Sequence, residues 1–135
     1  MTATEHPSIV LMRRYFEALI AGDTRTVMEY YTDDLVAHVP GHSRHAGTYV
    51  GREAVFEYYT RVFQDTDGGF EDVRVRDILA SDRHVAVLVD WTLRRGERRL
   101  EIDRVVLYRI EGDKITEIWV RDWDQDAYDE FFADA

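Results

Sequence analysis

The chain has no cysteine among its 135 residues, and it has no long apolar run. The first absence excludes a disulfide, a thiolate nucleophile and a metal site built on cysteine. The second excludes a membrane span, which needs roughly 18 consecutive apolar residues. The segment from Met1 to Ser8 is polar and carries no hydrophobic signal sequence. We therefore expect a cytoplasmic protein with no membrane association.

Positive charge is also scarce, since 17 lysines and arginines face 27 aspartates and glutamates and the net charge is −10. Nucleic acids and anionic membrane surfaces both need a basic face, so neither is an expected partner. The basic cluster from Arg94 to Arg99 surrounds Gly96 and is typical of a solvated hairpin tip. The length fits one domain, residues 1–135, and 45% hydrophobic residues supply its core.

Motifs for metals and cofactors are absent or incomplete. There is no glycine-rich phosphate loop and no nucleophile elbow. The spacing of His38 and His42 resembles a metal pair, but Pro40 and Gly41 prevent a helix from carrying both. The acidic run from Asp122 to Asp126 begins like a calcium loop but lacks the required glycine and the final acid. We expect neither a metal nor a cofactor.

Helical periodicity dominates the first half of the sequence. Ser8 is a suitable N-cap for a first helix, because apolar residues recur at helical spacing after it. Asp23 or Thr24 is a suitable N-cap for a second helix, and Gly51 opens a third helical pattern. A short alternating stretch is stopped by Pro40 and Gly41. The predicted elements are helices over residues 8–22, 23–31 and 51–63 and a strand over Leu35–Val39.

The second half of the sequence changes to a period near two, with short turns between long alternating runs. Such connections predict an antiparallel meander. The fold class is therefore α+β: a cone in which a curved antiparallel sheet wraps on three N-terminal helices and leaves an internal pocket. The predicted strands are Phe70–Ala80, Val85–Arg95, Leu100–Ile110 and Lys114–Trp123, followed by a short helix over Asp126–Phe132.

Several short stretches, taken together in their order and spacing, carry a family resemblance over nearly the whole chain. They are Arg14–Leu19, Ala21–Asp23, Tyr31–Asp34, Pro40-Gly41 with Gly47, Gly51–Val55 and Gly112–Ile115. In these the sequence resembles the nuclear-transport-factor-two-like superfamily, and within it the ketosteroid isomerases and the SnoaL-like polyketide cyclases. This fold hosts enzymes, binding modules and transport factors, so the resemblance is more specific for fold than for reaction.

The isomerase resemblance assigns roles to individual positions. Tyr15 matches the oxyanion-binding tyrosine, and Tyr31 and Tyr59 match two tyrosines that support it by hydrogen bonds. His38 stands where the isomerase has its general base. The partner acid of the oxyanion hole would fall near Val105, which is a departure from the family pattern. In the cyclases an inward aspartate on the last strand is the acid or base, and Asp122 resembles that position.

Side-chain alternation suggests which strand residues line the pocket. In the register assumed from the turns, three aspartates, Asp90, Asp103 and Asp122, point into an otherwise apolar hollow. A histidine near neutrality can take and return a proton, and a carboxylate would orient it, with Asp122 or Asp90 as partner for His38. The remaining residues expected on the pocket face are Ala86, Leu88, Thr92, Val105, Leu107, Ile118 and Val120.

The function predicted from these residues is a cofactor-independent acid–base enzyme, an isomerase or an aldol-type cyclase. It would act on a small hydrophobic carbonyl compound. One alternative is a non-catalytic module of the same fold that binds a small ligand or a protein. Another is an epoxide hydrolase, whose Asp-Arg-Asp set would include Asp90 and Asp122. The alternation, however, points Arg104 and Arg121 away from the hollow.

Three tryptophans fall on the opposite alternation from the inward acids: Trp91, Trp119 and Trp123. An exposed aromatic sheet face usually has a partner. We therefore expect a homodimer formed through the outer face of the sheet.

Overall fold

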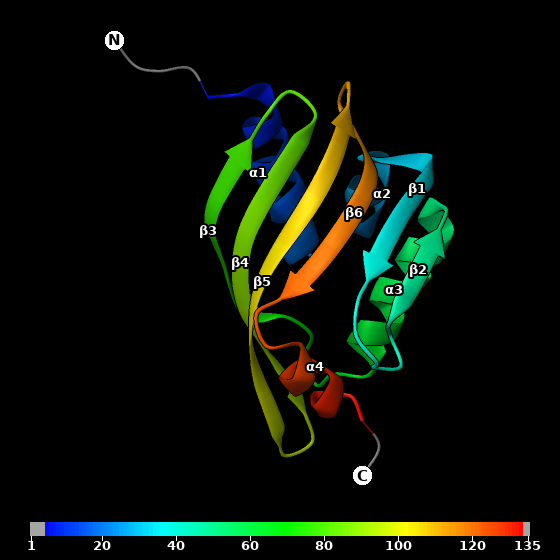
Figure 1. Cartoon of the computed structure of the whole chain (residues 1–135), viewed down its shortest axis with the longest axis vertical. Helices are drawn as coiled ribbons and strands as arrows, with labels where there is room; N and C mark the ends of the chain where they lie inside the picture. The colour runs from blue at the N-terminus through cyan, green and yellow to red at the C-terminus, as the bar shows by residue number, and fades with distance from the viewer. Residues whose placement is uncertain (1–4, 134–135) are drawn as a thin grey trace.

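The computed structural model describes residues 5–133, which form four helices and six strands (Figure 1). Residues 1–4, the start of the polar N-terminal segment, lie outside the described part. The elements in chain order are α1 (Pro7–Ile20), α2 (Thr24–Glu29), β1 (Tyr31–Val39), β2 (Gly47–Val50), α3 (Arg52–Gln64), β3 (Glu71–Ala80), β4 (His84–Arg95), β5 (Arg98–Glu111), β6 (Lys114–Asp122) and α4 (Gln125–Phe131).

Local sequence signals explain where the helices begin. Pro7 occupies the first turn of α1, where its missing N–H costs nothing, and the side chain of His6, rather than the expected Ser8, caps the helix. Asp23 caps α2 by accepting a hydrogen bond from the backbone N–H of Thr26. Gly51 precedes α3 with a φ of +92°, a conformation that favours glycine.

All six strands belong to one sheet in the order β2-β1-β6-β5-β4-β3. The predicted meander from β3 to β6 is confirmed, with antiparallel pairing throughout. Two features differ from the prediction. β1 pairs with β6 in parallel, so the sheet is mixed, and β2, a four-residue strand, lies in a segment for which no strand was predicted.

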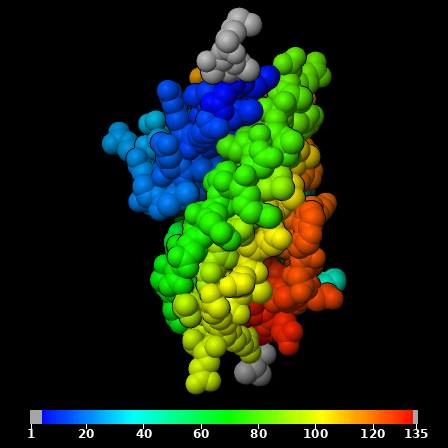
Figure 2. All heavy atoms as spheres, turned by 90° about the vertical axis from the view of Figure 1, so that its left-hand side faces the viewer, coloured from blue at the N-terminus to red at the C-terminus, as the bar shows by residue number. Residues whose placement is uncertain are grey.

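The sheet curves around the helices and forms the expected α+β cone. Figure 1 shows α1 and α2 behind the sheet, α3 behind β1 and β2, and α4 beyond the end of β6. Figure 2, turned by 90°, shows β3 crossing the molecule beside α1, with the β4–β5 hairpin extending further. Helices therefore cover the concave face, and the convex face lacks such a layer.

The core lies between the helices and the concave face. Met12, Leu35 and Ile115 are fully buried there. Burying such a side chain stabilises the fold by about 1.5–3 kcal/mol. A second apolar cluster, which includes Tyr128, Phe131 and Phe132, attaches α4 to the sheet.

Strands β4 and β5 present the opposite faces from those predicted. Val85, Val87 and Val89 of β4 are buried against the helices, and β5 places Arg104 and Val106 beside them. The prediction was wrong because both strands carry apolar residues at both alternations, so polarity does not distinguish their faces. The convex face instead takes Leu88, Asp90, Asp103, Val105 and Leu107.

Candidate functional site

Two neighbouring hollows occupy the helix side of the sheet. The outer hollow lies among α1, α2 and α3 and has a volume of about 330 Å³. That is the lower end of the size of small-molecule sites. Its lining is mostly apolar: Leu19, Gly22, Thr24, Val27, Met28, Tyr31, Phe56, Tyr59, Thr60, Phe63 and Gln64.

The inner pocket lies deeper, between the helices and the concave face. Its volume is only about 50 Å³, enough for a few water molecules and too small for an organic ligand without side-chain movement. Leu19 and Tyr59 line both hollows and form the boundary between them. The inner lining is Phe16, Leu19, Ile20, Tyr58, Tyr59, Phe70, Val73, Val89, Trp91, Arg104, Val106, Tyr108 and Val120.

Tyrosine hydroxyls meet at this boundary. The hydroxyls of Tyr15 and Tyr31 are 2.6 Å apart, and Tyr59 interacts electrostatically with both. The structure thus brings together the three tyrosines named from the sequence. Tyr108 of β5 joins them through Tyr15. Sequence reasoning missed this fourth member because β5 was assigned the wrong face.

Burial controls the electrostatics of this tyrosine cluster. It raises the pKa values of Tyr15 and Tyr31 well above the ordinary value for tyrosine, so both hydroxyls stay neutral donors. Burial also raises the pKa of Tyr59, while a hydrogen bond with Tyr15 and the positive charge of Arg104 act in the opposite direction. Tyr108 experiences the same two opposing effects; of these two tyrosines at the inner pocket, Tyr59 is the one that also lines the outer hollow.

A buried ion pair adjoins the inner pocket. Arg104 donates two hydrogen bonds to Asp122, from Nε at 2.6 Å and from Nη2 at 3.0 Å. Burial disfavours the charged guanidinium, but the charge of Asp122 outweighs it and raises the pKa of Arg104. Tyr58 and Tyr128 are also electrostatically coupled to this arginine. Arg104 lines the pocket and Asp122 lies behind it.

The inward direction of Arg104 contradicts the sequence analysis. An epoxide hydrolase set would nevertheless remain incomplete, because its second aspartate, Asp90, lies on the convex face. There Asp90 is bonded to Arg74 at 3.0 Å and paired with Arg76 at 3.2 Å. Asp103, also expected in the hollow, pairs with Arg76 on the same face.

His38 does not face the hollow. It alternates with Ala37 and Val39, which are buried, and its ring stacks on Trp119 of β6 on the convex face. Its Nε2 lies 2.6 Å from Glu117 Oε2, a partner not foreseen from the sequence. We predicted an inward ring because the family has its general base at this position. The strand alternation by itself indicates an outward ring. From this side of the sheet His38 does not reach the pocket.

The remaining predicted positions divide between the two faces. Val120 lines the inner pocket, and Ile118 is fully buried in the core nearby. Leu88 and Val105 lie on the convex face, for the reason given for β4 and β5. Among the three tryptophans, Trp119 faces outward as expected, whereas Trp91 lines the inner pocket.

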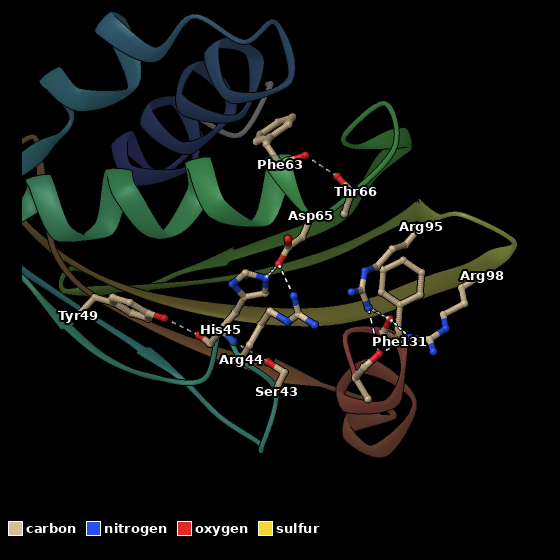
Figure 3. A network of polar contacts seen from close by, with 11 residues as sticks. Ser43, Arg44, His45, Tyr49, Phe63, Asp65, Thr66, Arg95, Arg98 and Phe131 are labelled. Atoms are coloured by element: carbon tan, nitrogen blue, oxygen red, sulfur yellow. Dashed lines mark hydrogen bonds and ion pairs between the residues drawn. The ribbon is translucent and has the colours of Figure 1, made fainter. Parts of the chain in front are cut away.

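A polar network joins the loop between β1 and β2 to the C-terminal end of α3 (Figure 3). His45, which is 1% exposed, lies with Nε2 at 2.7 Å from Oδ2 of Asp65 at the C-terminal end of α3. Its backbone carbonyl accepts a hydrogen bond from the hydroxyl of Tyr49. Burial lowers the pKa of His45, and Asp65 partly offsets that effect. The network fixes the loop between β1 and β2 against α3.

Neither a metal cluster nor a membrane helix is found within residues 5–133. No three His, Asp or Glu side chains there are grouped so that they could hold a metal ion. In the same part of the chain, no helix combines the length and apolarity needed to cross a membrane.

The α+β cone with a pocket under its helices defines a class of small single-sheet proteins. The sequence then identifies the family within this class. Residues 12–118 match the SnoaL-like domain, and the chain belongs to this family. The resemblance seen in the short motifs is thereby confirmed. No match was found among curated proteins.

Solved structures show the same architecture. Bal32a, from a soil-derived mobile gene cassette, is 29% identical with a TM-score of 0.86, covering 93% of this chain and 95% of its own. A Xanthomonas campestris protein of unknown function with a cystatin-like fold is 27% identical with a TM-score of 0.88, covering 96% and 100%. TerC, co-crystallized with polyporic acid, is 17% identical with a TM-score of 0.82, covering 94% and 98%.

Proposed function

We propose that the chain binds a small apolar carbonyl compound and promotes proton transfer next to its carbonyl group, as an isomerase or aldol-type cyclase does. No cofactor takes part in this proposal. The observation that carries it is the meeting of Tyr59 and Arg104 in one apolar pocket. Both groups can donate hydrogen bonds in a mostly apolar setting, which strengthens their action on a substrate oxygen.

Tyr59 is the donor that contacts the substrate oxygen in this proposal. Tyr15, named from the sequence for that role, is fully buried and lines neither hollow. It acts behind Tyr59 together with Tyr31, because a hydroxyl that accepts a hydrogen bond becomes a better donor. The developing enolate oxygen thus draws on the whole tyrosine cluster.

Asp122 is the proposed acid–base group. It is the carboxylate next to the inner pocket, and its side chain is 5% exposed. Arg104 holds it by two hydrogen bonds and itself belongs to the lining. When a substrate oxygen accepts hydrogen bonds from Arg104, one carboxylate oxygen of Asp122 loses its hydrogen bond and becomes free to act. The carboxylate then removes a proton from the adjacent carbon and returns it to another position.

A test needs no knowledge of the natural substrate. 1-Indanone exchanges the hydrogens beside its carbonyl with D₂O when it is enolised, and proton NMR follows their loss. We expect the protein to accelerate this exchange. Tyr59→Phe should reduce the acceleration about 10²- to 10³-fold, the usual effect of removing one oxyanion donor, and Asp122→Asn should abolish it. Tyr49→Phe is the control, because its hydroxyl bonds to a backbone carbonyl elsewhere. Exchange that is unaffected by Tyr59→Phe contradicts the proposal.

One observation favours a second candidate, a binding module without catalysis. Among residues 5–133, no carboxylate or histidine lines the inner pocket, and Asp122 is hydrogen-bonded to Arg104. Binding of 1-indanone with no acceleration of exchange would support this candidate. Acceleration that is lost in Asp122→Asn would exclude it.

A further inference from the structure

Two buried side-chain atoms within residues 5–133 have no hydrogen-bond partner, His45 Nδ1 and Trp91 Nε1. The imidazole of His45 is already held through its other nitrogen, and His45 lines neither hollow. Trp91 differs in both respects. Its indole N–H is its one polar group, and its side chain belongs to the lining of the inner pocket.

The side chains that pack on the indole ring of Trp91 do not supply an acceptor for its N–H. The guanidinium carbon of Arg104 lies 4.8 Å from the indole centroid, and the ring of Phe70 packs at 5.4 Å. An indole N–H can only donate, and so can a guanidinium. A buried donor without a partner is unusual in a folded protein and calls for an explanation. An acceptor brought by a ligand provides one.

We propose that Trp91 Nε1 donates a hydrogen bond to a second oxygen of the bound compound, distinct from the oxygen held by Tyr59. The ligand class is then an apolar compound with two carbonyl-type acceptors. This inference takes the location of the site from the proposed function, and it names Trp91 as the residue that selects the substrate. It does not require that the substrate react.

Charge favours a neutral acceptor over a carboxylate at this position. Arg104 is already neutralised by Asp122 through two hydrogen bonds. The chain as a whole carries a net charge of −10, which repels anions at long range. A neutral ketone oxygen accepts a hydrogen bond from Trp91 without needing a free counter-charge and without long-range repulsion.

The size of the two hollows determines where the ligand body goes. The inner pocket, at about 50 Å³, accommodates little more than the oxygen-bearing end. The outer hollow of about 330 Å³ takes the apolar remainder. Leu19 and Tyr59 stand at the boundary, so the ligand passes between them.

Two probes isolate the second oxygen: 2,2-dimethylindane-1,3-dione and 2,2-dimethylindan-1-one. Both have the same frame, both are neutral, and neither has a hydrogen that can be removed beside the carbonyl. Calorimetry then measures binding alone. We expect the wild-type protein to bind the dione about five- to tenfold more tightly, the effect of one neutral hydrogen bond together with the twofold statistical advantage of two equivalent carbonyls.

Trp91→Phe should bring this preference down to about twofold, the statistical factor alone. Trp119→Phe is the matched control, because that tryptophan lies on the convex face, and it should keep the wild-type preference. A Trp91→Phe protein that retains the wild-type preference overturns the inference.

A second measurement applies even if Trp91→Phe fails to fold. The indole N–H proton signals are few, and that of Trp91 is identified by substituting each of the other two tryptophans in turn. Saturation with the dione should move it downfield, and the monoketone should move it less. An unchanged signal at saturation overturns the inference, and so does failure of the wild-type protein to bind either probe. Dione preference without exchange of 1-indanone hydrogens upholds this inference and refutes the proposed catalysis.

Discussion

Arg104 and Asp122 face each other across the β5–β6 ladder and form a bidentate ion pair with 8% and 5% of their side-chain surfaces exposed. The pair therefore links two neighbouring strands under the helices. Buried charges are tolerated only when they are paired and hydrogen-bonded. The same pair places a guanidinium at the inner pocket, so one ion pair both links two strands and contributes to the pocket lining.

Breaking this pair should destabilise the protein strongly. Asp122→Asn leaves the guanidinium buried without a counter-charge, and we expect a loss of about 3–5 kcal/mol in the free energy of unfolding. Urea denaturation measures it. Arg74→Gln is the control: Arg74 is 76% exposed and paired with Asp90, so its removal should cost less than about 1 kcal/mol. Equal losses in the two variants would show that the buried ion pair stabilises the fold no more than the surface pair does.

Filling the outer hollow should prevent ligand binding while leaving the fold intact. Thr60 of α3 lines this hollow, and Thr60→Trp places a large ring in it. We expect the affinity for 2,2-dimethylindan-1-one to fall at least about tenfold, because the apolar body loses its place. The neighbouring Glu57 is exposed and lines neither hollow, so Glu57→Trp should bind as the wild type does. Unchanged binding by Thr60→Trp would place the ligand elsewhere.

His45 should make stability depend on pH on the acidic side of neutrality. Burial lowers its pKa in the folded state; Asp65 raises it, and Arg44 and Arg61 lower it further. The unfolded chain keeps the ordinary value of about 6.5. Because the unfolded state then binds the proton more readily, stability is full above about pH 6.5 and is lost as the pH falls toward the lowered value.

Urea denaturation between pH 7.5 and pH 5 measures this dependence, and His45→Gln should flatten it. The matched control is His38→Gln, since His38 is partly exposed on the convex face. A His45→Gln protein with the wild-type pH dependence would show that another group is responsible.

The convex face should mediate a homodimer, as expected from the sequence. Trp119, Val105 and Leu107 lie there half-buried, without a covering layer of helices. Light scattering after gel filtration should give twice the mass of 15.9 kDa. Trp119→Glu should shift it to the monomer, since a charge in an isologous interface meets its own copy. The exposed Trp123, at 74%, supplies the control Trp123→Glu. A monomeric wild type contradicts the prediction.

Short-range patterns determined most of the architecture. The caps and apolar spacing set α1, α2 and α3, and the turns between alternating runs set the β3–β6 meander, within a few residues of the observed bounds. The short motifs also placed Tyr15, Tyr31 and Tyr59 correctly as a group. The helices and the meander depend on neighbours in the chain, so the sequence alone expresses them, whereas the family resemblance is what grouped the tyrosines.

The tertiary structure decided the rest, because it depends on contacts between distant segments. The parallel pairing of β1 with β6 joins strands far apart in sequence, and no turn signals it. β4 and β5 are apolar at both alternations, so only packing against the helices turned Trp91 and Arg104 inward and Asp90 outward. The sequence by itself therefore determined the cone and its tyrosines, whereas packing decided which charged and aromatic groups face the pocket.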